Sequence, residues 1–334
     1  METKAKGKDR TPVYCEIAFL KKFAENNPSI MPIDDVKVWL GLYDILNRCS
    51  MQIDVKTESY FDEMQKGPLM LQQLWKRHAN GDSELQFSEN HKCDNYIEKL
   101  MVCKDARTIY LLDKEGKKCI DYGAIAISAD NLKQQAHLFK DNGCAIEKDY
   151  HGNWKKILTK EYDLTRCNSM IVVDNYIFKN PENLFSLLDG LLPYKLKCVF
   201  HLSIFTESIN DANKKYHQLK SQIERLRPEL KVQLSLYVSN GKSAFHDRAI
   251  LTNNTWISCD GGFDLFNERG KAMKSTKISI IYPHIQSAID WSLPAYNNLI
   301  RQTREVKQKF ESEKGYGEVF PKDSPLEENR LYMI

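Results

Sequence analysis

Short apolar runs alternate with longer amphipathic stretches along the first 150 residues. The apolar runs predict strands at residues 13–19, 51–55, 108–112, 122–128 and 144–146. Between them, apolar positions recur at helical spacing, which predicts helices at residues 34–47, 68–79, 92–104 and 130–142. Strands that alternate with helices are typical of a parallel sheet with helices on both faces. The pattern therefore predicts a first α/β domain at residues 11–150.

A polar and charged stretch at residues 151–166 interrupts this pattern and predicts a linker. Beyond it, strands are expected at residues 169–176, 197–205, 231–238 and 277–282, and helices at residues 181–192, 210–227 and 287–314. These elements predict a second α/β domain at residues 167–305. Residues 306–334 contain glycine, proline and mixed charge, and are expected to form a helix end and a loosely ordered tail.

Composition narrows the classes of protein to which the chain can belong. With 48 basic and 45 acidic residues the formal net charge is +3, which excludes a bulk polycation but allows a local basic patch. No run of eighteen apolar residues occurs, so no transmembrane helix is expected. The charged N-terminus lacks the apolar stretch of a secretory signal. Nine cysteines without a CxxC pair indicate buried free thiols in a reducing cytoplasm.

Residues 245–266 concentrate side chains that suit phosphate chemistry. The segment opens with His246 and Arg248, turns at Asn253 and closes on Asp264. An imidazole at position 246 is able to attack phosphorus, and a guanidinium at position 248 is able to bind phosphate oxygens bidentately. The simpler interpretation is that His246 hydrogen-bonds a neighbour and stabilises a turn, and that Asp264 caps the glycine turn before it.

The same segment resembles the histidine motif of phospholipase D-type phosphodiesterases, which reads His-x-Lys-x4-Asp. Here Arg248 stands in place of the lysine, and Asn253 lies where the carboxylate is expected. A neutral amide cannot stabilise an imidazolium by charge, so the motif is a departure from the catalytic pattern.

A broader resemblance covers residues from about 168 to 300. It is carried by the segments 171–177, 198–202, 246–248, 253–256 and 262–264. They resemble the C-terminal phospholipase D-like domain of MIT-domain cytokinesis proteins and its bacterial relatives, with Asn175 where that family has proline. The resemblance implies an α/β sandwich that binds phosphate or another ligand through Asp174, His201, Arg248, Asn253 and Asp264. In the membrane-binding relatives this domain is a binding module.

Acidic residues at strand ends point to a different chemistry in the first domain. Glu16 ends the first predicted strand, Asp130 follows the strand at 122–128, and Asp94 and Glu98 lie on the helix before it. Residues 124–146 resemble the last acidic strand–helix unit of PIN-like nucleases. This resemblance implies that Mg²⁺ or Mn²⁺ is held by Glu16, Asp94, Glu98 and Asp130, of which Glu16, Asp94 and Asp130 are catalytic. Asp94 and Asp130 are equally natural helix caps.

These features leave three hypotheses for the function. The first is a cytosolic, bacterial-type nuclease or nucleic-acid-directed effector, connected with defence, whose second domain recognises phosphate or a partner. The second is metal-free phosphodiester cleavage through His246, which requires a homodimer because the chain carries one copy of the motif. The third is a non-enzymatic module that binds anionic lipid, nucleic acid or a protein partner. Lysine pairs such as Lys21-Lys22, with Trp75 and Trp154 interleaved, permit a nucleic-acid surface.

Overall fold

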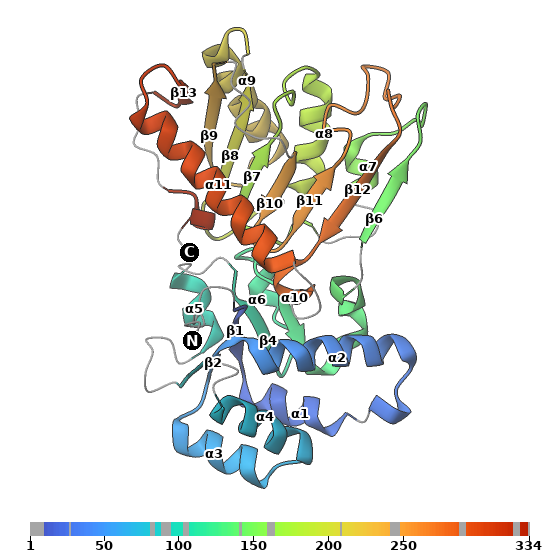
Figure 1. Ribbon diagram of the computed structural model, residues 1–334, viewed down its shortest axis with the longest axis vertical. Helices are drawn as coiled ribbons and strands as arrows, with labels where there is room; N and C mark the ends of the chain where they lie inside the picture. The colour runs from blue at the N-terminus through green and yellow to red at the C-terminus, as the bar shows by residue number, and fades with distance from the viewer. Residues whose placement is uncertain are drawn as a thin grey trace, which may run out of the picture.

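Two sheets lie along the long axis of the molecule, the N-terminal sheet at one end and the larger sheet at the other (Figure 1). The computed structural model describes residues 10–26, 28–80, 84–87, 95–102, 107–139, 142–158, 164–207, 209–240, 248–286, 292–322 and 328–332. Helices pack on both sheets, as the alternating apolar pattern predicts, and the α/β fold class is confirmed.

The N-terminal sheet is all-parallel, with the strand order β3-β2-β1-β4-β5. Parallel neighbours require a crossover between them, and helices supply most of these crossovers here. The strands are β1 Pro12–Cys15, β2 Ser50–Ile53, β3 Glu84–Gln86, β4 Ile109–Leu112 and β5 Ala126–Ser128. The helices are α1 Ile17–Glu25, α2 Ile33–Arg48, α3 Thr57–Lys66, α4 Leu69–Ala79, α5 Tyr96–Val102 and α6 Lys117–Ile120, with short 3-10 segments at Pro28–Ile30 and Ala129–Phe139.

The second sheet is mixed and has the strand order β13-β9-β8-β7-β10-β11-β12-β6. Its strands β7, β8 and β9 are parallel, and the others pair antiparallel. The strands are β6 Asn142–Ile146, β7 Ser169–Val173, β8 Phe200–Glu207, β9 Val232–Ser239, β10 Ala249–Thr252, β11 Trp256–Cys259, β12 Thr276–Ile281 and β13 Gly317–Phe320. The helices are α7 Trp154–Leu158, α8 Pro181–Leu191, α9 Ala212–Leu226, α10 Pro283–Gln286 and α11 Ser292–Ser312, with a 3-10 segment at Arg330–Tyr332.

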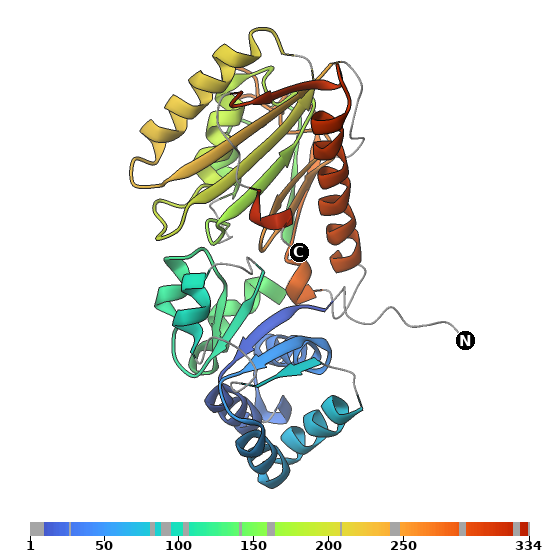
Figure 2. The same ribbon diagram turned by 90° about the vertical axis from the view of Figure 1, so that its left-hand side faces the viewer.

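Helices cover this second sheet on both sides. Figure 2 shows α9 and α11 on opposite faces, and α11 crosses its face diagonally in Figure 1. Leu293, Tyr296 and Ile300 of α11 are buried against Ile171 and Leu251 of the sheet. The buried apolar positions of α11 therefore repeat at helical spacing, as its sequence predicts.

The second sheet begins earlier in the chain than the sequence predicts. Strand β6, inside the range assigned to the first domain, pairs with β12 at the edge of the second sheet. The predicted linker 151–166 contains α7, whose Trp154 is fully buried and donates its indole N–H to the carbonyl of Phe263 at 2.9 Å. Three apolar residues among polar ones are enough to bury one side of this short helix.

The expected loose tail also contributes to the second sheet within the described residues. Strand β13 pairs antiparallel with β9, and Phe320 is 1% exposed. Further on, Leu331 and Tyr332 are buried in the same cluster as α11. Apolar residues in a short, mostly polar segment therefore hold it to the sheet.

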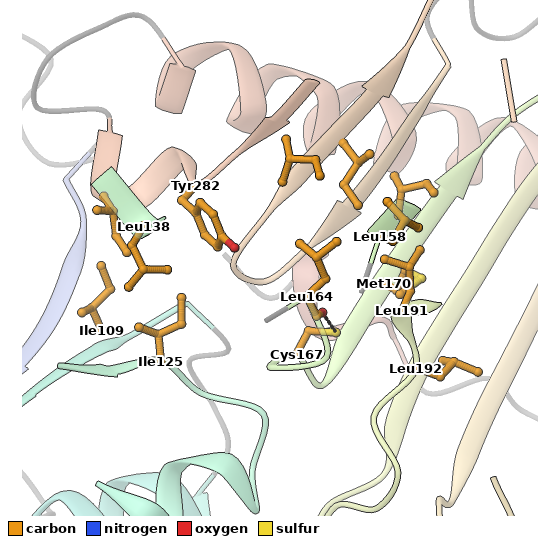
Figure 3. Packing of buried hydrophobic residues seen from close by; sticks show 14 of the residues in the cluster. Ile109, Ile125, Leu138, Leu158, Leu164, Cys167, Met170, Leu191, Leu192 and Tyr282 are labelled. Carbon is orange, nitrogen blue, oxygen red and sulfur yellow. Dashed lines mark hydrogen bonds between the residues drawn. The ribbon is translucent and has the colours of Figure 1, made fainter. Parts of the chain in front are cut away.

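A continuous buried cluster joins the two sheets. Figure 3 shows Ile109, Ile125 and Leu138 of the N-terminal part facing the cluster that contains Tyr282 and Leu164 of the second part. The two sheets therefore share apolar burial. None of the described helices combines the length and the apolar surface that a bilayer crossing needs.

Candidate functional site

Four of the five strands of the N-terminal sheet are followed at once, or after one residue, by a carboxylate. Glu16 follows β1, Asp54 follows β2, Asp113 follows β4 and Asp130 comes two residues after β5. The strands are parallel, so their carboxyl ends meet at one edge of the sheet. In open α/β sheets this edge is where ligands bind.

Hydrogen bonds tie these carboxylates to the loops around them. Glu16 Oε2 accepts from the Asp113 N–H at 2.8 Å, and Asp54 Oδ1 accepts from the Ile17 N–H at 2.8 Å. The turn from β1 into α1 is thus linked to the ends of both neighbouring strands, β2 and β4. The loop after β5 is tied in through Ser128, whose hydroxyl donates to the Asp113 carbonyl and accepts from the Asp130 N–H.

One ammonium group lies between two of the carboxylates. Lys22 Nζ, from α1, is 2.6 Å from Asp113 Oδ1 and 3.0 Å from Asp130 Oδ1. These two contacts raise the pKa of Lys22, because they favour its charged form. Asp113 and Asp130 therefore already share one cation at the sheet edge.

The same edge disfavours negative charge at its centre. Burial raises the pKa of Glu16; the hydrogen bond from Asp113 opposes this, and the charges of Asp54 and Asp113 add to it. Burial likewise raises the pKa of Asp54. Close carboxylates in a partly buried site favour either a proton or a bound cation.

Two of the four predicted metal ligands lie at the edge of the N-terminal sheet. Glu16 and Asp130 lie at the sheet edge, Glu98 lies on α5, and Asp94 falls outside the described residues. Within the described ranges, no three His, Cys, Asp or Glu side chains form a group that could hold a metal ion. The sequence pattern did not identify Asp54, Asp113 or Lys22 as site residues. The signal for the two aspartates is their position directly after a strand.

The predicted ligand residues of the second part divide into two groups. Asp174, at the end of β7, is 1% exposed, and its two carboxylate oxygens accept from the N–H groups of Tyr176 and Phe263 at 2.8 and 2.7 Å. Arg248 precedes β10, and Asp264 lies 3.8 Å from Lys274 Nζ. The structure thus brings Asp174, Arg248 and Asp264 to one end of the sheet, with Asp174 bracing the loops.

Asn253 and His201 lie elsewhere and make structural contacts. Asn253 is fully buried at the opposite end of β10, where its Oδ1 accepts from the Asn168 N–H and its Nδ2 donates to the Gly123 carbonyl. His201, on β8, is 3% exposed, and its Nδ1 accepts from the Arg330 N–H at 3.2 Å. Burial, with the charge of Arg330, lowers the pKa of His201 to about 4. The predicted role of these two side chains in ligand binding stays a prediction.

The Asn253 contact belongs to a larger connection between the two parts. Asn254 Nδ2 also donates to the Gly123 carbonyl, at 3.3 Å, and to the Arg166 carbonyl. Asn168 Nδ2 donates to the Tyr122 carbonyl at 2.8 Å. These amides hold the loop that precedes β5. His246, the predicted nucleophile, lies outside the described residues.

A comparison with known protein families finds a match for the second part of the chain. Residues 153–286 match the model of the phospholipase D-like domain at the C-terminus of MIT. The match begins next to α7 and ends in α10, so it covers the central strands of the second sheet but not β6 or β13. No curated protein matches the chain. Because the match does not reach the N-terminal sheet, the resemblance of that sheet to PIN-like nucleases stays a prediction.

Proposed function

We propose that the chain is a nuclease, or a nucleic-acid-directed effector, that hydrolyses phosphodiesters at the N-terminal carboxylate edge. The observation that carries this proposal is the convergence of Glu16, Asp54, Asp113 and Asp130 at the carboxyl ends of parallel strands. In this proposal the phospholipase D-like region recognises a phosphate-bearing ligand or a partner.

A divalent cation is compatible with this edge through two carboxylates. Mg²⁺ keeps several waters in most proteins and is bound by one or two carboxylates together with substrate phosphates. Asp113 and Asp130 form such a pair, since both already contact the Lys22 ammonium. When bound, Mg²⁺ or Mn²⁺ would activate water and stabilise the leaving oxygen.

The remaining side chains have roles that follow from their charge. Lys22 would move from the two aspartates to a phosphate oxygen of the substrate, which keeps its ammonium paired. Glu16, with its raised pKa, would accept a proton from the attacking water. Asp54 would keep the first turn of α1 in place through its bond to the Ile17 N–H.

The test is cleavage of labelled single-stranded RNA and DNA with Mn²⁺ and, in parallel, with EDTA. We expect cleavage only with metal, and loss of cleavage in Asp113→Asn and Asp130→Asn. Asp62→Asn is the matched control, because Asp62 is exposed on α3 and pairs with Lys66 on the same helix. Cleavage that survives EDTA would move the chemistry to the His246 segment. An absence of cleavage in both conditions would leave a binding module for anionic lipid, nucleic acid or protein.

A further inference from the structure

An exposed tyrosine lies against a buried arginine at the end of the second sheet opposite Asp174. The Arg227 guanidinium carbon is 4.6 Å from the centroid of the Tyr194 ring. Arg227 is 4% exposed, whereas Tyr194 is 73% exposed. Strands β7, β8 and β9 are parallel, so the loops that precede β8 and β9 lie at the end away from Asp174, which follows β7. One face of the tyrosine ring therefore lies against the cation, and the other is open to solvent.

Hydrogen bonds fix Arg227 in this position. Its Nε donates to the Leu192 carbonyl at 3.2 Å, and its Nη2 donates to the carbonyl and the carboxylate of Asp189 at 2.7 and 2.9 Å. Its backbone N–H donates to the Ile223 carbonyl at 2.8 Å and ends α9. A buried guanidinium needs such partners, and here they join the end of α8 to the end of α9. The fold thus presents Tyr194 on a rigid base, which lowers the entropy lost when a second ring stacks on it.

The surface around the ring is charged. Within the described loops 192–199 and 227–231, Tyr194 is the only large apolar side chain that is exposed. Lys195 and Glu229 are 71% and 74% exposed and 3.9 Å apart, a geometry that contributes little to stability. The centre of a protein–protein interface is depleted in charged residues, so this surface does not favour a protein partner. One open ring face among lysines is typical of proteins that stack nucleobases.

Lysines continue from this surface towards the carboxylate edge of the N-terminal sheet. Lys197 Nζ lies 2.8 Å from the carboxylate of Asp121, which directly follows α6. Helix α6 begins four residues after Asp113, and its two lysines are exposed, although Glu115 lies 3.7 Å from Lys117. The four residues of α6 span about 6 Å. Along the chain, one short helix therefore separates the tyrosine loop from the proposed hydrolytic edge.

We propose that Tyr194 stacks on a base of a single-stranded nucleic acid whose phosphates lie along Lys195, Lys197 and the lysines of α6. This inference rests on the proposed action on nucleic acid, and it names the substrate class as single-stranded. Bases in a duplex stack on one another, so duplex DNA should bind more weakly than a single strand. Arg227 positions the tyrosine ring and does not contact the base.

The test measures binding of a labelled single-stranded oligonucleotide of about 12 nucleotides to the full chain by fluorescence anisotropy. The buffer contains EDTA, so that the proposed metal-dependent cleavage leaves the probe intact. We expect saturable binding that weakens about 5- to 150-fold in Tyr194→Ala, which corresponds to the loss of one stacked base. Tyr194→Phe keeps the ring and should stay within about twofold of the wild type. A probe of the same length without bases should bind the wild type and Tyr194→Ala equally.

Two further variants separate stacking from charge. Tyr150→Ala is the matched control, because Tyr150 is 42% exposed and its ring packs against Phe266, away from Arg227. It should leave the affinity unchanged. Lys195→Met should weaken binding of both probes alike and reduce the salt dependence of binding, since a lysine at a phosphate acts regardless of the base.

Several results would overturn this proposal. Equal affinities of the wild type and Tyr194→Ala would do so, as would an equal loss in Tyr150→Ala or equal binding of the two probes by the wild type. If no oligonucleotide binds saturably, the surface is not a nucleic-acid site, and a protein partner becomes the better explanation for Tyr194. Asp113→Asn should keep every affinity unchanged, so a failure of the proposed hydrolysis at the N-terminal edge is separable from a failure of stacking on Tyr194.

Discussion

Acid should destabilise this protein through His201, because this histidine is buried and uncharged in the folded state. Its folded pKa is about 4, against 6.5 for the free side chain, chiefly because burial disfavours the imidazolium. Between these two values the unfolded chain binds the proton and the folded chain does not. Stability therefore rises with pH across this window, and the contribution is lost as the pH falls from 6.5 towards 4. Full loss amounts to about 3 kcal/mol, and about 2 kcal/mol is already lost at pH 5.

The assay is urea unfolding at pH 7 and pH 5 for the wild type and for His201→Gln. Glutamine retains an acceptor for the Arg330 N–H but has no proton to gain. The wild type should lose about 2 kcal/mol more than the variant between the two pH values. His284, whose pKa burial also lowers, is present in both proteins and cancels in the difference. Equal losses in both proteins would refute the reasoning.

Three further substitutions test the connections between sequence and fold. Trp154→Ala should lower the free energy of unfolding in urea by about 3–5 kcal/mol, because it empties a fully buried site. A decrease below about 1 kcal/mol would instead support the prediction that residues 151–166 are a linker. Gly123→Ala should cost about 1–3 kcal/mol or more, since φ is +67° and the new Cβ would lie 2.4 Å from the Cys167 backbone; an unchanged melting temperature would contradict this. Lys22→Met leaves Asp113 and Asp130 without their ammonium, so Mn²⁺ should raise its melting temperature more than that of the wild type, and an equal rise would argue against a shared cation site.

The fold class was predictable because its signals are local. Apolar runs separated by amphipathic stretches indicate βα units, and the parallel N-terminal sheet follows from them. The boundary between the two parts was not predictable in this way. Strand β6 reads like the end of the first domain, yet it pairs with β12, which lies some 130 residues later. Only the pairing partner of β6 shows to which sheet the strand belongs, and the local sequence does not determine that partner.

The candidate sites show the same limit. Strand ends identify Glu16 and Asp130 correctly as residues of one sheet edge, but not which other acidic residues join them. Asp113 joins because β4 lies next to β1, a fact of strand order that spacing along the chain does not contain. For Asn253, the motif position suggests a ligand, whereas burial against Gly123 gives it a structural contact. A motif constrains which residues are near each other, and burial decides what they contact.

The contacts between the two sheets predict that neither half is stable alone. Cutting after residue 150 separates β6 from all five of its partners in β12. The cut also exposes the Gly123 carbonyl, which accepts from Asn253 and Asn254, and divides the cluster that contains Ile125 and Leu164. Buried polar groups without partners and newly exposed apolar surface both disfavour the folded fragment. Residues 1–150 and 151–334, produced separately, should therefore show no cooperative thermal unfolding, measured by circular dichroism, under conditions in which the whole chain does. Two fragments that each unfold cooperatively near the melting temperature of the whole chain would mean that the shared cluster contributes little.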